Sequence, residues 1–100
     1  MDYKGMQFVW DLEKAEINRK KHGVTFEEAR TAFFDALSQI YDDEEHSDNE
    51  ERFILIGESE NTRLLVVCHC YRESDTVTRI ISARKAESVE RRKYETGGME

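Results

Sequence analysis

Basic side chains gather near the end of the sequence. From Arg79 to Tyr94 there are six Lys or Arg residues and two Glu residues, a local balance of +4 in a chain whose formal net charge is −7. A basic patch on an acidic protein is typical of polyanion binding. Arginine suits this role because its planar guanidinium stays charged and can bind a phosphate through two parallel hydrogen bonds. The segment therefore predicts a site for a phosphate-bearing ligand.

A strand and a helix must position these basic residues. The run Thr76–Ala83 is rich in β-branched residues and predicts a strand that passes directly into a helix. In that helix Arg84 and Arg91 are seven residues apart and should project from nearly the same face. Ala86 and Val89 should point the other way, into the core.

The first part of the chain predicts a short strand and two helices. The strand is expected at Met6–Trp10. Asp11 can cap the first helix, and Gly23 can end it in a left-handed conformation. Thr25 and Glu28 form a capping box for the second helix. Its apolar face should carry Phe26, Ala29, Phe33 and Leu37.

The remaining strands are apolar runs separated by short turns, as in antiparallel hairpins. They are expected at Ser38–Asp43, Arg52–Glu58, Arg63–Tyr71 and Thr76–Ala83. The order strand, two helices, three or four antiparallel strands and a final helix predicts an α+β domain. We expect this single domain at residues 6–96, with a flexible extension at 1–5 and a flexible tail at 97–100.

Composition limits the classes of function. One hundred residues, of which 37% are charged, allow one modest core with no room for an internal cofactor. We find no apolar run of about 18 residues and no targeting segment, so we expect a soluble cytoplasmic protein without a membrane partner.

Cys68 and Cys70 are too close to form a disulfide bond and should be reduced thiols. With His69 they could suggest a metal site, but zinc ligands are usually spaced more widely, and no metal is expected.

Asp42–Glu51 departs from the rest of the chain in its charge. It contains seven carboxylates and no Lys or Arg. Such a run is typical of a solvated loop.

Short motifs extend through nearly the whole chain in a fixed order: Phe8-Val9-Trp10-Asp11, Asn18 with Lys21-His22-Gly23-Val24, Phe26-Glu27-Glu28-Ala29, Asp35, His46-Ser47, Glu51-Arg52, Gly57 and Arg79-Ile80-Ile81-Ser82-Ala83-Arg84. This ordered set resembles the BrnT family, the toxin half of BrnT/BrnA type II toxin–antitoxin modules. The resemblance implies a RelE-like fold and a ribonuclease that inhibits translation. It also implies a partner, a small ribbon-helix-helix antitoxin, BrnA, that wraps the toxin and represses their operon on operator DNA.

A ribonuclease of this type needs neither metal nor cofactor. The 2′-hydroxyl of the RNA attacks the adjacent phosphate, so the protein must place a base, an acid and cations around one phosphorus. Arginines would hold the phosphate, and histidines suit proton transfer near neutral pH. The candidate catalytic residues are Arg52, Arg79, Arg84, His22 and His46. The candidate RNA-binding residues are Trp10, Lys20, Lys21, Arg63, Arg91 and Tyr94, of which the two aromatic residues would stack on bases.

Each arginine has a structural alternative. Arg84 could form a surface salt bridge. Arg79, which has the parity of a partly buried strand face, could pair with Glu51 or Asp35. Arg52 could belong to the ordinary charge alternation of a strand.

The other candidates have alternatives too. His22 could hydrogen-bond the last carbonyls of its helix, and His46 lies among carboxylates that would repel phosphate and would raise its pKa. Arg63 could be a solvated turn residue, and Trp10 could be a lid on the core. His69, in an apolar row, is expected in the core or on a sheet face.

A second function of a different class also fits the sequence. The chain could be a non-catalytic subunit that binds the antitoxin within an operon-repressing complex. The net charge of −7 is compatible with this function, because free RNA would be repelled whereas a basic antitoxin would be attracted.

Overall fold

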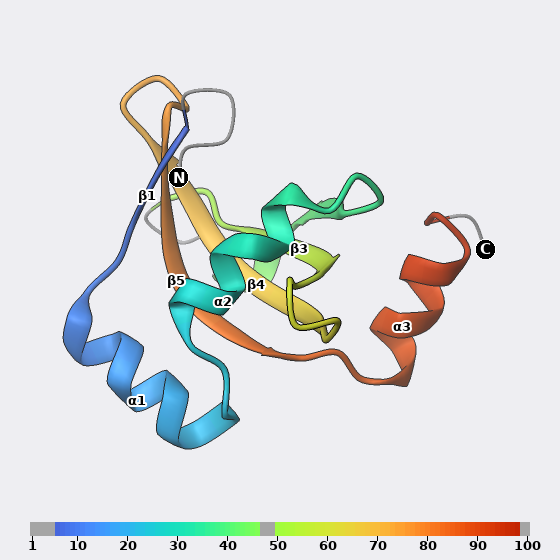
Figure 1. Ribbon diagram of the computed structural model, residues 1–100. Helices are drawn as coiled ribbons and strands as arrows, with labels where there is room; N and C mark the ends of the chain where they lie inside the picture. The colour runs from blue at the N-terminus through green and yellow to red at the C-terminus, as the bar shows by residue number, and fades with distance from the viewer. Residues whose placement is uncertain (1–5, 47–49, 99–100) are drawn as a thin grey trace.

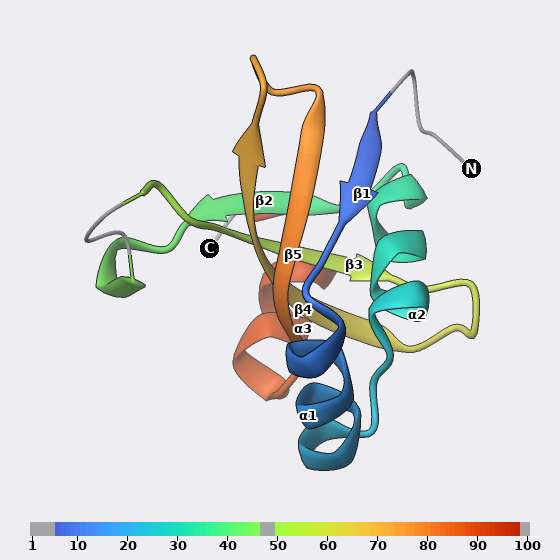
Figure 2. The same ribbon diagram turned by 90° about the vertical axis from the view of Figure 1, so that its left-hand side faces the viewer.

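The computed structural model describes residues 6–46 and 50–98, except the side chain of His46. In these residues a five-stranded mixed sheet lies between helices on its two faces (Figures 1 and 2). The α+β class predicted from the sequence is confirmed. Residues 1–5 and 99–100, predicted to be flexible, lie outside the described residues, whereas Gly97 and Gly98 hydrogen-bond back to Tyr94 and Lys93.

The sheet has the strand order β1-β5-β4-β3-β2. Its strands are β1 (Gln7–Val9), β2 (Gln39–Asp42), β3 (Phe53–Glu58), β4 (Leu64–Arg72) and β5 (Val77–Lys85). Neighbours are antiparallel except β1, which pairs with β5 in parallel. The parallel pair was not predicted, because the contact joins the two ends of the chain and leaves no local signal.

The helices begin at the capping residues read from the sequence. Helix α1 (Leu12–His22) starts after Asp11, whose carboxylate accepts from the Lys14 backbone N–H, and ends at Gly23 with φ 70°. Helix α2 (Phe26–Thr31) starts after Thr25, whose hydroxyl accepts from the backbone N–H of Glu28. Two short 3₁₀ helices, η1 (Ala32–Phe34) and η2 (Glu44–His46), complete this part of the chain.

The second helix is shorter than its apolar spacing predicts. After η1 the chain turns, and Asp35 accepts a hydrogen bond from the Leu37 backbone N–H. Leu37 is therefore outside the helix and 69% exposed, so its assignment to the apolar face was wrong.

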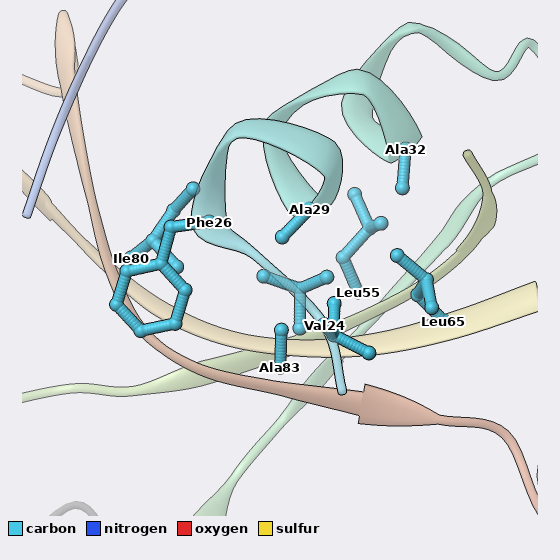
Figure 3. Close-up of a cluster of buried hydrophobic side chains, with 9 residues drawn as sticks. Val24, Phe26, Ala29, Ala32, Leu55, Leu65, Ile80 and Ala83 are labelled. Atoms are coloured by element: carbon cyan, nitrogen blue, oxygen red, sulfur yellow. The ribbon is translucent and has the colours of Figure 1, made fainter. Parts of the chain in front are cut away.

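The main core fills the face of the sheet covered by α2. Figure 3 shows Phe26 and Ala29 of α2 directed at side chains of β3, β4 and β5. The full cluster is Val24, Phe26, Ala29, Ala32, Leu55, Leu65, Val67, Ile80 and Ala83. Gly57 allows β3 to approach this layer, since a Cβ atom there would lie 2.7 Å from the Ala32 carbonyl oxygen.

A smaller cluster lies on the opposite face, under α3 (Ser88–Glu95). Ile56, Leu64 and Val66 form it, and Ala86 and Tyr94 pack against it. Figure 2 shows α2 and α3 on opposite sides of the sheet. The candidate site lies on this same face, bordered by the end of α1 and by η2.

The final helix begins later than expected. Strand β5 continues to Lys85, which pairs with Leu65, and Glu87 then caps α3. Arg84 is therefore a strand residue, and its predicted helical alignment with Arg91 was wrong. Val89 is 64% exposed, so its prediction as a core residue was also wrong. Among the described helices, none has the length and apolarity required to span a bilayer.

Candidate functional site

A cleft of about 650 Å³ opens on the α3 side of the sheet. Three of the five predicted catalytic residues line it: His22 from the end of α1, Arg52 just before β3, and Arg84 from β5. Its floor is formed by Ile54, Val66, Cys68, Ser82 and neighbouring residues of β3, β4 and β5. Arg79 is not among the lining residues, and the side chain of His46 lies outside the described part of the chain.

An irregularity in β5 sets which side chains face the cleft. Cys68 pairs with Ser82, but the next residue of β4, His69, pairs with Ile80, so Ile81 is an extra residue. Such a β-bulge inverts the alternation of side chains beyond it. Because Cys70 pairs with Arg79 and Val66 with Arg84, the bulge puts both arginines on the same face of the sheet. Simple parity would have put them on opposite faces.

Arg84 is held by a two-point ion pair. Its Nη1 and Nη2 atoms donate to Glu90 Oε1 and Oε2 at 3.1 and 2.9 Å, and Nη1 also donates to the Lys85 carbonyl oxygen. These hydrogen bonds raise the pKa of the guanidinium and lower that of the Glu90 carboxyl. The salt bridge predicted as the alternative for Arg84 is thus present. The Nε–H and the second Nη2–H make no hydrogen bond among the described residues, so one side of the fork remains for a phosphate.

Asn18 positions His22 relative to the strands. Its side chain lies 6% exposed within α1. Its Nδ2 donates to the carbonyl oxygens of Val24 and Ala83 at 3.0 and 2.9 Å, and its Oδ1 accepts from the Ala83 backbone N–H at 3.0 Å. One side chain therefore fixes the end of α1 against β5, next to Arg84. Asn18 belongs to one of the sequence motifs, but this role was not predicted from it; an amide in the middle of a charged helix was the available signal.

Carboxylates form the other end of the cleft. Asp42, Asp43, Glu44 and Glu45 all line it. Asp43 is only 8% exposed, so it departs from the solvated loop predicted for this segment. The Cys68 thiol lies 3.6 Å from Asp43 Oδ2, and burial, together with that carboxylate, raises the Cys68 pKa to about 11. Cys68 is consequently a protonated thiol near neutral pH and a poor nucleophile.

Three predicted RNA-binding residues make structural contacts. The Trp10 ring packs edge-on to Phe26 at 6.0 Å and borders the main core, as its alternative predicted. Arg63 pairs with the nearly buried Glu28 and also donates to the Gly23 carbonyl oxygen. These contacts place Trp10 and Arg63 away from the cleft-lining set.

Tyr94 is the third predicted RNA-binding residue that makes structural contacts. Its hydroxyl donates to Asp35 Oδ2 at 2.6 Å. Burial, together with this carboxylate, raises the Tyr94 pKa to about 12. Asp35 also accepts from the backbone N–H groups of Glu58 and Leu37. Burial opposes ionisation of Asp35, but these hydrogen bonds outweigh it and lower its pKa. Asp35 is therefore engaged here, and the alternative that it pairs with Arg79 was wrong.

The remaining RNA-binding candidates are exposed. Lys20 lies 4.0 Å from Glu16 on the outer side of α1, and Arg91 lies on the surface of α3. Lys21 lines a smaller groove next to the cleft. Arg79, a catalytic candidate, pairs with Val9 of β1, two residues before the Asp11 cap of α1. The hydrogen bond from the Lys14 backbone N–H is the main cause that lowers the pKa of Asp11, and the charge of Arg79 acts in the same direction.

His69 is a core residue, as predicted. It is fully buried, and its ring nitrogens contact the Val67 carbonyl oxygen at 3.1 Å and the Tyr71 hydroxyl at 3.0 Å. Both cysteines are free, and Cys70 is buried. Within residues 6–46 and 50–98, no group of three or more His, Cys, Asp or Glu side chains is arranged to hold a metal ion.

Comparisons with known proteins agree with the resemblance read from the motifs. The family model described as "Ribonuclease toxin, BrnT, of type II toxin-antitoxin system" matches residues 10–90. The crystal structure of the Brucella abortus ribonuclease toxin, BrnT, has a similar fold, with a TM-score of 0.63 and 21% sequence identity. That similarity covers 83% of this chain and 99% of the Brucella chain. A comparison with curated protein sequences gave no match.

Proposed function

Because the chain belongs to the BrnT family of ribonuclease toxins of type II toxin–antitoxin systems, we propose that it is a metal-independent endoribonuclease. Its cleavage of RNA would inhibit translation in the cytoplasm, and a BrnA-type ribbon-helix-helix antitoxin would neutralise it and connect it to operator DNA. The fold would be of the RelE type. One observation carries the catalytic proposal: His22, Arg52 and Arg84, from three separate parts of the chain, line one cleft.

The three residues have chemically distinct roles in this proposal. The side of the Arg84 guanidinium that Glu90 does not occupy binds two phosphate oxygens, and Arg52 adds a second positive charge across the cleft. Charge that develops on the phosphate during attack by the 2′-hydroxyl is thereby stabilised. The imidazole of His22 transfers a proton to or from a reacting oxygen. His46 and Arg79 remain candidates for further roles in catalysis.

The carboxylates of the cleft favour the second candidate function. Four of them line the cleft from β2 and the residues that follow it, and β2 is separated from β5 by β3 and β4. They would repel RNA phosphates, whereas they would attract a basic antitoxin. In that case the chain would be a non-catalytic subunit of an operon-repressing complex.

Expression experiments separate the two functions. The chain is induced alone and then together with its neighbouring gene, while growth and total RNA integrity are followed. Growth arrest with RNA fragmentation, rescued by the neighbour, supports the nuclease. Normal growth and intact RNA, with soluble folded protein, support the binding subunit. Cleavage by the purified protein in excess EDTA tests metal independence.

Arg84→Ala tests the site itself. We expect it to lower RNA cleavage by at least about 100-fold, as for loss of one charge-stabilising donor, and to abolish growth arrest. Antitoxin binding should be preserved, and the protein should remain folded although the loss of the Glu90 ion pair lowers its melting temperature somewhat. Arg84→Lys keeps the charge but loses the fork, so it should restore only part of the activity. Unchanged toxicity of Arg84→Ala contradicts the assignment, and joint loss of activity and antitoxin binding indicates a structural role for the Arg84–Glu90 pair.

A further inference from the structure

A groove of about 210 Å³ continues the cleft along α1. It shares three lining residues with the cleft, His22, Ile81 and Ser82. Its other wall is the face of α1 that carries Lys14, Ile17 and Lys21. The groove and the cleft therefore form one continuous depression that passes over the bulge of β5.

The two ends of this depression have opposite charge. Asp42, Asp43, Glu44 and Glu45 line the cleft end, where Arg52 is the neighbouring cation and its carbonyl oxygen accepts from the Asp43 backbone N–H. The groove instead has two lysines and no carboxylate among its lining residues. A polyanion held at Arg84 is repelled at the first end and attracted at the second. A chain of phosphates can therefore leave the site favourably in one direction only.

Lys14 and Lys21 are suited to bind phosphates because their charges are available. Both are exposed, and neither forms an ion pair among the described residues. By contrast, Arg19 and Lys20 on the outer side of the same helix are paired with Glu16. Lys14 and Lys21 are seven residues apart, about 10 Å along the helix axis, so they can contact different phosphates.

An exposed apolar residue lies between the two lysines. Ile17 is 59% exposed and lines the groove. It is three residues after Lys14 and four before Lys21, and thus on the same face of α1. An apolar surface between two cations fits a nucleotide, whose base or ribose would cover Ile17 while the flanking phosphates contact the lysines.

We propose that the groove between α1 and the bulge of β5 binds single-stranded RNA on one side of the scissile phosphate, with Lys14 and Lys21 as phosphate ligands and Ile17 as an apolar contact. This inference rests on the proposed nuclease function and adds a directional substrate site to it.

The test measures RNA binding separately from cleavage. A fluorescent pool of mixed-sequence 2′-O-methyl RNA 20-mers cannot be cleaved by 2′-hydroxyl attack, and its binding is followed by anisotropy at several salt concentrations. For the double variant K14A/K21A we expect weaker binding and a salt slope lower by about 1.4, since each phosphate contact contributes about 0.7 for single strands. When the salt concentration is raised from 50 to 200 mM, the RNA affinity of the wild type should then fall by a factor about seven-fold larger than that of the variant.

The control R19A/R72A removes the same charge from two surface ion pairs outside the groove. It should bind the RNA pool like the wild type. Equal binding by K14A/K21A and the wild type, or equal loss in both double variants, overturns the inference. Lys14→Gln with Lys21→Gln repeats the test if the alanine variant melts at a lower temperature.

Cleavage of natural RNA is assayed in parallel. A wild type that cleaves RNA but whose binding does not depend on Lys14 and Lys21 overturns the groove and leaves the nuclease function intact. A wild type that binds RNA through the groove without cleaving it overturns the nuclease function alone. Binding should strengthen when a bound oligonucleotide is extended on one side of the cleavage site and not on the other; equal gains on both sides overturn the directionality.

Discussion

At the scale of single residues, the geometry of Arg84 allows both of the roles that its sequence position suggested. Glu90 takes the two terminal nitrogens of the guanidinium. A carboxylate in that position fixes the plane of the fork without using Nε–H, so a structural ion pair and a phosphate ligand are compatible on one side chain. The same carboxylate accepts from the Glu87 backbone N–H at 2.7 Å, so Arg84 is oriented by the first turn of α3.

Removal of the Tyr94 hydroxyl alone distinguishes a structural role of this residue from a role in RNA binding. Tyr94→Phe keeps a ring that could stack on a base but removes the 2.6 Å hydrogen bond to the Asp35 carboxylate. Because hydrogen bonds to charged groups contribute about 1.5–3 kcal/mol, we expect the free energy of unfolding in urea to fall by about 1.5 kcal/mol. RNA affinity should be unchanged. Lower RNA affinity with full stability would instead restore Tyr94 to the RNA-binding set.

His69 should make the protein less stable in mildly acidic solution. Burial lowers its pKa from 6.5 to about 4, although the Val67 carbonyl acts in the opposite direction. Between these values the unfolded chain binds more protons than the folded one, so stability falls as the pH falls. The contribution of His69 between pH 7 and pH 5 is about 2 kcal/mol.

Urea unfolding at both pH values, on the wild type and on His69→Gln, measures this contribution. Both proteins share the pH dependence that comes from the carboxylates, so the difference between them isolates His69. We expect the loss on acidification to be about 2 kcal/mol smaller in His69→Gln. Identical pH dependence in the two proteins would show that the pKa of His69 is the same in the folded and the unfolded chain.

At the scale of elements, α1 is joined to β5 by the Asn18 side chain more than by packing. Ile17 and Leu12 of α1 are 59% and 80% exposed, and Asn18 is its buried residue. We expect Asn18→Ala to lower the free energy of unfolding by about 3 kcal/mol, because the Ala83 N–H and C=O lose their buried partners. Hydrogen exchange of the Ala83 amide should also be faster in this variant, because the amide no longer donates to Asn18 Oδ1.

Arg19→Ala is the matched control for Asn18→Ala. It changes the next residue of the same helix, which is exposed, and should alter stability by no more than about 0.5 kcal/mol. If Asn18→Ala is equally mild, the three hydrogen bonds are not what holds α1. A large loss of RNA cleavage with little loss of stability would indicate that Asn18 acts mainly by placing His22.

The elements also show which features the sequence predicts. The starts of α1 and α2 were predicted because their caps, Asp11 and Thr25, are local signals, and each side chain accepts from the backbone N–H three residues later. The second half of the predicted capping box was wrong, because the Glu28 carboxylate binds Ser59 and Arg63. The end of β5 was not predicted, because it depends on pairing with Leu65, twenty residues earlier. The same holds for the bulge at Ile81, which no local pattern marks and which decides that Arg79 and Arg84 share a face.

The candidate site was predicted only in part, because contacts that depend on the tertiary structure leave no local signal in the sequence. Residue chemistry was sufficient to select His22, Arg52 and Arg84, and the fold brings them to one cleft. Their supports were missed, because Glu90 and Asn18 act through contacts that depend on the tertiary structure. The assignment of Trp10 and Arg63 to RNA binding rested on residue type alone, and in the structure their side chains contact Phe26 and Glu28.

At the scale of the whole molecule, the excess of acidic residues is unevenly placed with respect to the site. The chain has 22 Asp and Glu against 15 Lys and Arg, yet the groove beside α1 is lined by Lys14 and Lys21 and the far end of the cleft by carboxylates. The local field at the site therefore differs from the field of the net charge. Exposed charges beyond the Debye length of about 8 Å at physiological salt contribute little to it.

Neutralising the acidic end of the cleft tests whether local or net charge limits RNA binding. The variant Asp42→Asn, Glu44→Gln, Glu45→Gln leaves the buried Asp43 intact. Coulomb's law in water gives roughly 0.4 kcal/mol for two unit charges 10 Å apart, so three neutralised charges should strengthen binding about eight-fold at low salt. At 1 M salt the Debye length is about 3 Å and the gain should vanish.

The control, Glu27→Gln with Glu60→Gln and Glu73→Gln, makes the same change of net charge at exposed positions outside the cleft. Equal gains in both variants would mean that net charge governs RNA binding. A gain confined to the first variant, with weaker binding of a basic antitoxin, would mean that the acidic end of the cleft excludes RNA and attracts the antitoxin.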